Sequence, residues 1–242
     1  MKKVAISQSN YIPWRGYFDL ISSVDEFVIF DEVQYTKRDW RNRNKIKTKD
    51  GSQWITVPVT VKGKFLQKIS DTQIENNYWQ AKHWKTIKNN YFKTPYFSEL
   101  ENDLKKIYYD EKFLYLSKLN RRLIEFFCKY LGIKTKIRES YEFDLKNGQT
   151  EKLVNICLDL NADEYISGPA AKNYINDSVF NKNNIKLTYA DYSNYPKYEQ
   201  QFGDFIDNLS ILDLVFNCGK SSYKYMKHLN KIIKSGNFYF PY

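Results

Sequence analysis

Histidine and cysteine are scarce in this chain. Its 242 residues include only two histidines, His83 and His228, and three cysteines, Cys128, Cys157 and Cys218. The histidines lie far apart in sequence, and neither has the spacing to a second ligand that a histidine-based metal site requires. The cysteines form no Cys-x-x-Cys pair and are predicted to be reduced packing residues. Histidine-based metal catalysis and Cys-His or Ser-His-Asp mechanisms are therefore disfavoured.

Long apolar runs and the common nucleotide-binding motifs are also missing. No stretch approaches the roughly 18 to 20 apolar residues of a membrane span, and the run after the first three residues is too short for a secretory signal. The sequence therefore predicts a cytoplasmic protein without a membrane span. GxGxxG, P-loop and GxSxG motifs are absent, and we expect no bound cofactor.

Positive charge and aromatic residues are abundant. Lysine and arginine number 38 against 28 acidic residues, which gives a net charge of +10, and aromatics make up 17% of the chain. The lysines are scattered along the chain, as is typical of a solvated surface. An evenly basic surface attracts the phosphates of nucleotides, nucleic acids and acidic membranes without selecting among them. Dedicated nucleic-acid binding is therefore an alternative and not the leading interpretation.

The apolar pattern predicts an α/β fold, with a Rossmann-like, mostly parallel sheet in two α/β halves around a helical middle segment. The N-terminal half, residues 1–75, has expected strands at 4–6, 27–30, 54–61 and 65–69 and a helix at about 15–22. The middle, residues 76–132, has helices at 78–90 and 113–131, with a further helix start near 94–98. The C-terminal half, residues 133–242, has strands at 133–138, 164–166 and 185–190 and helices at 150–160, about 169–174 and 210–217. We expect these segments to form one compact unit.

Polar and cationic residues follow the first two predicted strands. The first strand runs into a polar, aromatic turn with a glycine, and the second ends on Asp31 and Glu32. A segment rich in arginine, asparagine and tryptophan comes next, at residues 37–47. Open α/β sheets build their ligand sites at the carboxyl ends of the strands. The sequence therefore predicts a site for an anionic, hydrogen-bonding ligand at this edge.

Three of the seven arginines, Arg38, Arg41 and Arg43, fall within six residues of a chain whose other cations are mostly lysine. Planar guanidinium groups suit bidentate phosphate contacts, while Asn44 can bond sugar hydroxyls and Trp40 can stack on a base or sugar. The alternative is a solvated loop whose arginines pair with surface acids. The concentration of arginine favours anion binding.

The carboxylates and the later loops each allow two interpretations. Asp31 ends a buried strand, so it could act as a base or simply pair with Arg38 or Arg41. The turn at Ser167 and Gly168 could offer free backbone N–H groups to an anion or be only a tight connection. The complete prediction has catalytic candidates Asp31 and Asp19, no metal ligand, and substrate-binding candidates Gln8, Asn10, Tyr11, Trp14, Gln34, Arg38, Trp40, Arg41, Arg43, Asn44, Ser167, Gly168, Tyr198 and Gln200.

Five strings resemble the WbqC-like protein family and together span nearly the whole chain: QSNYIPWRGYFD at 8–19, DEVQYTKRDWRNRN at 31–44, WITVP at 54–58, YISGPAA at 165–171 and LSILDLVFNCG at 209–219. Genes of this family typically lie in bacterial clusters for O-antigen and other surface polysaccharides. The resemblance implies a role in making a nucleotide-linked sugar, with acyl or aminoacyl transfer to the amine of an amino sugar. For that reaction Asp31 or Asp19 would be the base, and the clustered arginines would hold the diphosphate.

A weaker likeness, at the level of fold, links residues 13–17 to nucleotidyltransferases that carry His-x-Gly-His after their first strand. Trp14 and Tyr17 stand where those histidines would be, so the likeness supports a Rossmann-like nucleotide-binding fold more than adenylyl-transfer chemistry. A nucleotidyl-transferring or adenylate-forming enzyme, and a non-catalytic protein that binds RNA or a partner, stay open as alternatives. The acyl donor also stays open among acyl-CoA, acyl carrier protein and aminoacyl-tRNA, and an oligomer is possible.

Overall fold

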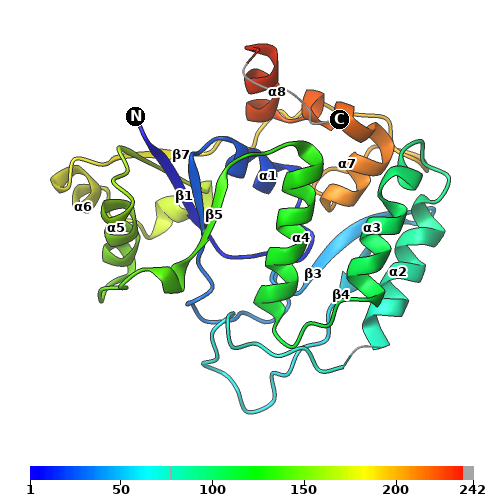
Figure 1. Cartoon of the computed structure of the whole chain (residues 1–242), viewed down its shortest axis with the longest axis horizontal. Helices are drawn as coiled ribbons and strands as arrows, with labels where there is room; N and C mark the ends of the chain where they lie inside the picture. The colour runs from blue at the N-terminus through cyan, green and yellow to red at the C-terminus, as the bar shows by residue number, and fades with distance from the viewer. Residues whose placement is uncertain (77, 237–242) are drawn as a thin grey trace.

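A single parallel sheet forms the centre of the molecule, which we describe from a computed structural model covering residues 1–76 and 78–236. Its five strands run in the order β5-β2-β1-β6-β7 (Figure 1). They are β1 (Lys3–Ser7), β2 (Glu26–Ile29), β5 (Lys136–Glu139), β6 (Glu164–Ser167) and β7 (Lys186–Tyr189). Every strand pair in this sheet is parallel. The predicted Rossmann-like α/β fold is thus confirmed, and strands from both predicted halves enter the same sheet.

Helices cover both faces of the sheet, because successive side chains of a strand point to opposite sides. Ala5, Phe27 and Ile29 join one apolar core with α1 (Arg15–Ser22) and α4 (Leu116–Leu131). Val4 and Val28 face a second core formed with α5 (Gln149–Asp159) and α6 (Asp177–Lys182). Figure 1 shows α5 and α6 on the left of the strands and α4 on the right. The short apolar strands therefore form the buried middle layer of a three-layer structure.

The predictions for residues 43–69 need correction. Residues 43–48, interpreted as part of the basic loop, form β3 (Arg43–Thr48), which pairs antiparallel with β4 (Gly51–Thr56) in a separate two-stranded sheet. The strand predicted at 54–61 already ends at Thr56, because Pro58 lacks a backbone donor and restricts Val57 before it. No strand forms over 65–69, where Lys68 makes only an isolated bridge with Gln34. Asn44 occupies an inward position of β3. Because a polar residue stands where a strand usually has an apolar one, the sequence does not show the alternation of apolar and polar residues that predicts a strand.

The remaining helices pack around the sheet and the hairpin. They are α2 (Tyr78–Tyr91), α3 (Phe97–Tyr109), α7 (Ile211–Cys218) and α8 (Lys227–Lys234), with 3-10 helices η1 (Ser140–Glu142), η2 (Pro169–Asn173) and η3 (Gly219–Tyr225). Helix α4 ends at Gly132 with φ 74°, as predicted, but begins at Leu116 instead of residue 113, because Leu114 and Tyr115 pair with the 73–74 segment. None of the helices in the described part of the chain has the length and apolarity needed to cross a bilayer.

The three cysteines are buried and unpaired, in agreement with their prediction as packing residues. Burial raises the pKa of the Cys157 and Cys218 thiols to about 12. Since the thiolate is the reactive form, the folded protein should resist alkylation by iodoacetamide at about pH 8. Mass spectrometry should find all three labelled only after unfolding in urea. Rapid stoichiometric labelling of the folded protein would contradict this expectation.

Candidate functional site

A buried polar cluster lies at the carboxyl ends of β1 and β2. Asp31 follows β2 and is only 3% exposed. It accepts two hydrogen bonds from Ser9, one from the backbone N–H at 2.8 Å and one from the hydroxyl at 2.7 Å. Asn120 of α4 donates to the Ser9 hydroxyl oxygen at 3.0 Å and to the carbonyl of Arg41 at 2.9 Å. Four separate segments of the chain therefore meet around one carboxylate.

Arg41 is the cationic member of this cluster. Its guanidinium donates to the side-chain oxygen of Asn10 and, at 3.3 Å, to the carbonyl of Ser9. Its Nε lies 3.7 Å from Asp39, and 14% of the side chain is exposed. Burial raises the pKa of Tyr174, the residue after η2, and the positive charge of Arg41 opposes that rise. Arg41 thus places a cation at the mouth of a buried carboxylate site.

The other two clustered arginines point elsewhere. Arg43 stacks its guanidinium on the ring of Trp54, 4.2 Å from the centroid, and donates to the carbonyl of Arg38. Arg38 is exposed and has φ 57°, in the left-handed region. The structure therefore brings one of the three predicted phosphate-binding arginines, Arg41, into the cluster and leaves Arg38 and Arg43 beside the β3–β4 hairpin.

A small cavity adjoins the cluster. Its volume is ≈ 160 Å³, and it is lined by Asn10, Pro13, Trp14, Trp40, Asn44 and Asn208. Two indoles with three carboxamides provide apolar faces and hydrogen-bonding groups, the combination that suits a sugar ring. Drug-sized ligand pockets typically start at about 300 Å³, so this cavity would enclose one part of a larger ligand. Asn10 belongs both to the cavity wall and to the contacts of Arg41.

The turn between β1 and α1 is held in a strained conformation beside this cavity. Ile12 has φ 42°, which is unusual for a β-branched residue and costs on the order of 1–3 kcal/mol. Asn44 fixes the turn by donating to the carbonyls of Tyr11 and Ile12 at 3.2 and 2.7 Å. The Tyr11 hydroxyl is buried against His83 and Tyr108, so Tyr11 anchors the turn from below and does not face the cavity.

Trp14 covers the start of α1. A Cβ on Gly16 would lie 2.2 Å from the indole of Trp14, so glycine is required for this close approach. The Trp14 ring packs edge-on against Tyr192 and Tyr195, and the hydroxyl of Tyr17 donates to the carbonyl of Gln8 at 3.0 Å. The two aromatic residues that replace the histidines of His-x-Gly-His therefore serve packing and loop support, which weakens the nucleotidyltransferase analogy.

The environment of Asp31 changes its acidity. Burial raises the pKa of Asp31 to about 6, against the lowering effect of the Ser9 hydrogen bonds and the Arg41 charge. The negative charge of Glu139 acts in the same direction as burial. A carboxylate with a pKa near the working pH can accept a proton from a substrate and release it again. Asp31 thus has the acidity expected of a general base.

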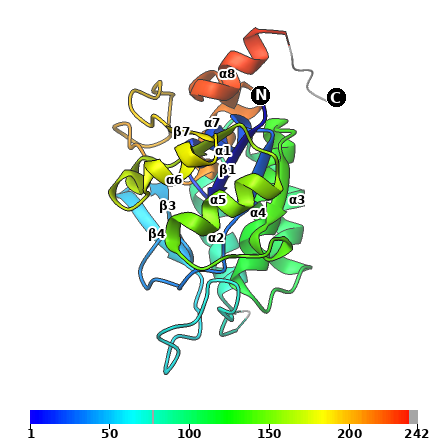
Figure 2. The same ribbon diagram turned by 90° about the vertical axis from the view of Figure 1, so that its left-hand side faces the viewer.

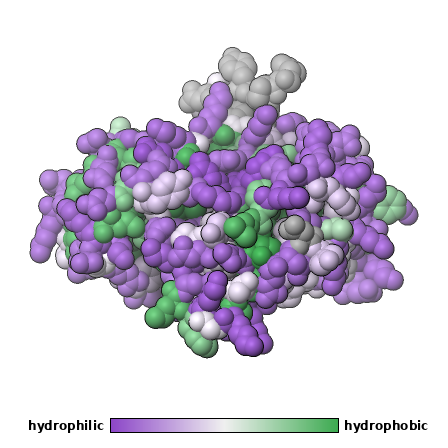
Figure 3. Space-filling model, turned by 60° about the horizontal axis from the view of Figure 1, so that its bottom comes forward, coloured by the Kyte–Doolittle hydropathy of each residue, from purple (hydrophilic) through white to green (hydrophobic). Residues whose placement is uncertain are grey.

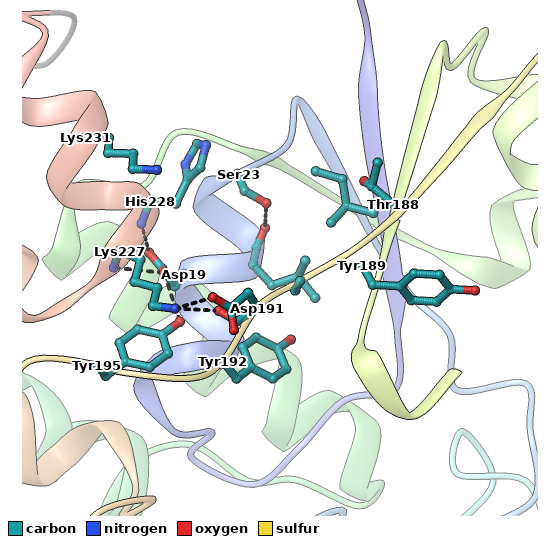
Figure 4. Close-up of a pocket in the computed structure, with 13 residues that line it drawn as sticks. Asp19, Ser23, Thr188, Tyr189, Asp191, Tyr192, Tyr195, Lys227, His228 and Lys231 are labelled. Carbon is teal, nitrogen blue, oxygen red and sulfur yellow. Dashed lines mark hydrogen bonds and ion pairs between the residues drawn. The ribbon is translucent and has the colours of Figure 1, made fainter. Parts of the chain in front are cut away.

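Asp19 lies outside the Asp31 cluster, and its hydrogen bonds hold parts of the fold together. Its carboxylate accepts the backbone N–H groups of Lys227, His228 and Leu229 at 2.8–3.0 Å, so it caps the first turn of α8. It also accepts the hydroxyl of Tyr195 at 2.9 Å. Figure 4 shows the contacts of Asp19 with Lys227, His228 and Tyr195 in a second cavity of ≈ 230 Å³ between α1, β7 and α8. The structure therefore does not bring Asp19 and Asp31 together.

Tyr198 and Gln200 belong to a buried network around Asp213. The Tyr198 hydroxyl and the Gln200 amide both donate to Oδ2 of Asp213 at 2.7 Å, and Tyr91 donates to Oδ1 at 3.0 Å. The buried Lys47 ammonium donates to Gln200 at 2.9 Å. These contacts join β3, α2 and α7 to the 198–206 loop. The two side chains predicted to line a sugar pocket are engaged in this network instead.

The remaining predicted residues lie around the edge of the cluster. Gln34 is exposed and donates to the carbonyl of Phe65. The Ser167 hydroxyl is buried against that of Tyr165 at 3.2 Å, and the space beside the Gly168 Cα is empty within 4 Å. Because β6 pairs with β1, Gly168 lies next to the end of β1, where the strand order diverges and doubly wound sheets bind their ligands.

Sequence reasoning missed Ser9, Asn120 and Tyr174. Asn120 gave a detectable signal, since it interrupts the apolar stripe of α4 one turn from Leu116 and from Leu123. Ser9 and Tyr174 gave no such signal, because their neighbours come from distant segments. Across residues 1–76 and 78–236 no group of three or more His, Cys, Asp or Glu side chains is placed to hold a metal ion.

Comparison with known proteins agrees with the sequence resemblance. The profile described as the WbqC-like protein family matches residues 8–225. An uncharacterized protein of Mycobacterium tuberculosis, Rv1507c, is 51% identical over 228 residues, which cover 94% of this chain and 99% of that protein. No solved structure matches significantly. The matched region includes the whole cluster around Asp31 and the small cavity lined by Trp14 and Trp40.

Proposed function

This chain belongs to the WbqC-like protein family, and we propose that it is a cytoplasmic bacterial N-acyltransferase acting on the amine of a nucleotide-linked amino sugar. The reaction would serve the synthesis of O-antigen or another surface polysaccharide. The observation that carries this proposal is the shared position of Asn10, which joins a sugar-sized aromatic cavity to a buried carboxylate and an arginine. Sugar, phosphate and proton acceptor would then have adjacent sites.

The cavity would hold the sugar. Trp14 and Trp40 offer their faces to the ring, and Asn10 and Asn208 offer hydrogen bonds to its hydroxyl groups, since the side-chain N–H groups of Asn44 are already donated to the turn. The nucleotide would extend over the cluster, where Arg41 meets a phosphate as a charge-assisted donor. Gly168, at the end of β6, leaves room for this part of the ligand.

Asp31 would receive the proton of the amine through Ser9. The Ser9 hydroxyl donates to Asp31 and accepts from Asn120, which leaves one lone pair for an amine hydrogen. As the amine nitrogen attacks the acyl carbonyl, the C–N bond forms, the Ser9 proton moves to Asp31, and the amine proton replaces it. The bond to the acyl carrier then breaks, and the departing sulfur or oxygen takes back the proton through Ser9, so that a thiol or hydroxyl leaves and Asp31 is ionised again. With Arg41 on the phosphate, the side-chain amide of Asn10 would be the donor that stabilises the oxyanion. Acyl-CoA, acyl carrier protein and aminoacyl-tRNA are the candidate donors.

Ligand binding gives the direct test. A sugar nucleotide at about a hundredfold its dissociation constant should stabilise the folded protein by about 2.7 kcal/mol, which a thermal shift detects. The screen would compare UDP-, dTDP-, GDP- and CMP-sugars, including amino sugars, with ATP and acyl-CoA. Arg41→Ala should weaken binding about ten- to a hundredfold, since hydrogen bonds to charged groups contribute about 1.5–3 kcal/mol.

Arg122→Ala is the matched control, because Arg122 pairs with Glu111 on the surface away from the cluster. It should leave the ligand-induced shift unchanged. If no sugar nucleotide stabilises the wild-type protein, or if Arg122→Ala weakens binding as much as Arg41→Ala, the proposed function fails. Salt-sensitive binding to tRNA without any sugar-nucleotide shift would favour the RNA-binding alternative.

A further inference from the structure

The segment from Thr60 to Ser70 projects from the same end of the molecule as the candidate site. Figure 1 shows it in cyan below the sheet, and Figure 2 shows the same projection from the side. Phe65 and Leu66, near its outermost point, are 72% and 83% exposed. Adjacent large apolar side chains with this exposure mark an interaction surface. We call residues 60–70 the basic tip.

The base of this tip is well anchored. The backbone N–H of Ile69 donates to Val33 at 2.9 Å, and that of Ser70 donates to the carbonyl of Asp31 at 3.0 Å. The N–H of Tyr35 donates to Gln67 at 2.9 Å. Ile69 is 1% exposed. The two apolar side chains are therefore presented by a hydrogen-bonded support that is continuous with the Asp31 loop.

Charge within the tip has one sign, although Glu32 and Asp71 lie beside Lys68. Residues 60–70 include Lys62, Lys64 and Lys68 and no acidic residue. Lys68 pairs with Glu32 at 2.6 Å, and the ammonium of Lys37 lies 5.2 Å from the centre of the Phe65 ring. Figure 3, which brings this end of the molecule forward, shows hydrophobic residues at its lower edge among hydrophilic ones. The tip thus presents two exposed apolar side chains, Phe65 and Leu66, with lysines close to them in the sequence.

We propose that the basic tip binds peripherally to a membrane that contains anionic lipids. Phe65 and Leu66 would enter the headgroup region, while Lys62 and Lys64 would contact lipid phosphates. Two features favour a lipid surface over an acidic protein. The tip is convex, and its cations are all lysines, which are depleted in protein interfaces where arginine is enriched. Lysine stems can also lie along apolar surface with the ammonium group in the headgroup layer.

This binding would orient the candidate site toward the membrane, because the Asp31 carbonyl is part of the support of the tip. The inference does not need the proposed acyl transfer, and vesicle binding is measured without turnover. Failure of one proposal therefore leaves the other standing.

Vesicle co-sedimentation tests the proposal. The full chain should sediment with vesicles of phosphatidylcholine and phosphatidylglycerol, and less with phosphatidylcholine alone. Phe65→Ser combined with Leu66→Ser should lower binding at least tenfold, and Lys62→Gln with Lys64→Gln should remove most of the dependence on anionic lipid and salt. Phe92→Ser is the matched control, since Phe92 is 54% exposed with Lys93 beside its ring, away from the tip. It should bind like the wild-type protein.

Three results would overturn the proposal. One is sedimentation of the wild-type protein that does not respond to anionic lipid, and another is an equal loss in the Phe92→Ser control. The third is tip-dependent binding to a soluble acidic protein, with purified acyl carrier protein as the probe, in the absence of vesicle binding. The substituted side chains are exposed, so all variants should keep the wild-type circular dichroism spectrum and urea midpoint.

Discussion

Asp31→Asn should lower acyl-transfer turnover by about a hundred- to ten-thousandfold, the range that general acid–base catalysis contributes. The carboxamide keeps the size of the carboxylate and can still accept the Ser9 backbone N–H, so the affinity for sugar nucleotide should change only a few-fold. Turnover would be measured with the sugar nucleotide identified in the binding screen. Ser9→Ala, which removes the proposed proton path and keeps the carboxylate, should cause a loss of similar size. Unchanged turnover in Asp31→Asn would remove Asp31 from the mechanism.

The same substitution should stabilise the folded protein at neutral pH. Burial raises the pKa of Asp31 from 3.8 to about 6, so between these values the folded state binds a proton that the unfolded state has released. Stability contributed by Asp31 is therefore complete below about pH 4 and is lost as pH rises through about 6, for a total of about 3 kcal/mol. Asparagine carries no charge and removes this dependence. Urea unfolding at several pH values should show that the free energy of unfolding of Asp31→Asn exceeds that of the wild-type protein, by an amount that grows with pH.

This combination of lost turnover and gained stability distinguishes a functional carboxylate from a structural one. Functional residues are commonly kept at a cost in stability. A variant that is less stable than the wild-type protein at every pH would show instead that Asp31 chiefly holds the β1 loop in place through Ser9. The base would then have to be sought elsewhere in the cluster.

Asp213→Ala should destabilise the protein by about 3–5 kcal/mol, the cost of breaking a buried charged network by removing one partner. Asp213 is fully buried. Its removal would leave the donors of Tyr91, Tyr198 and Gln200 without their acceptor and the nearby charge of Lys47 without its counter-charge. The free energy of unfolding of a folded domain is only about 5–15 kcal/mol, so this substitution would remove a large part of it. Circular dichroism in a urea series measures this loss.

Asp103→Ala provides the control, since Asp103 is exposed and pairs with Lys106 on the surface of α3. Its effect should stay within about 0.5 kcal/mol. A loss below about 1 kcal/mol in Asp213→Ala would mean that the network is not a structural requirement. Tyr198 and Gln200 would then be available to a ligand, as the sequence had suggested.

The sequence by itself determined the fold class and predicted where along the chain the candidate site would lie. Short apolar strands separated by amphipathic helices are buried on both faces only in a parallel sheet covered by helices. Polar residues directly after such strands gather at one edge by geometry alone. Asp31, Asn10 and Arg41 were predicted on this basis, and the structure places them in one cluster. The family was also evident from strings that span the chain.

Only the tertiary structure decided which of the candidate side chains meet. Asp19 and Asp31 were both predicted as candidates for the base, yet Asp19 caps α8 and Asp31 accepts its hydrogen bonds from Ser9. Arg43 falls on a strand whose partner carries Trp54, and that contact turns it away from Arg41. Local patterns set the period and burial of an element, whereas the choice of contact depends on segments more than a hundred residues apart, such as Ser9 and Asn120. That pairing is fixed by packing of the whole chain.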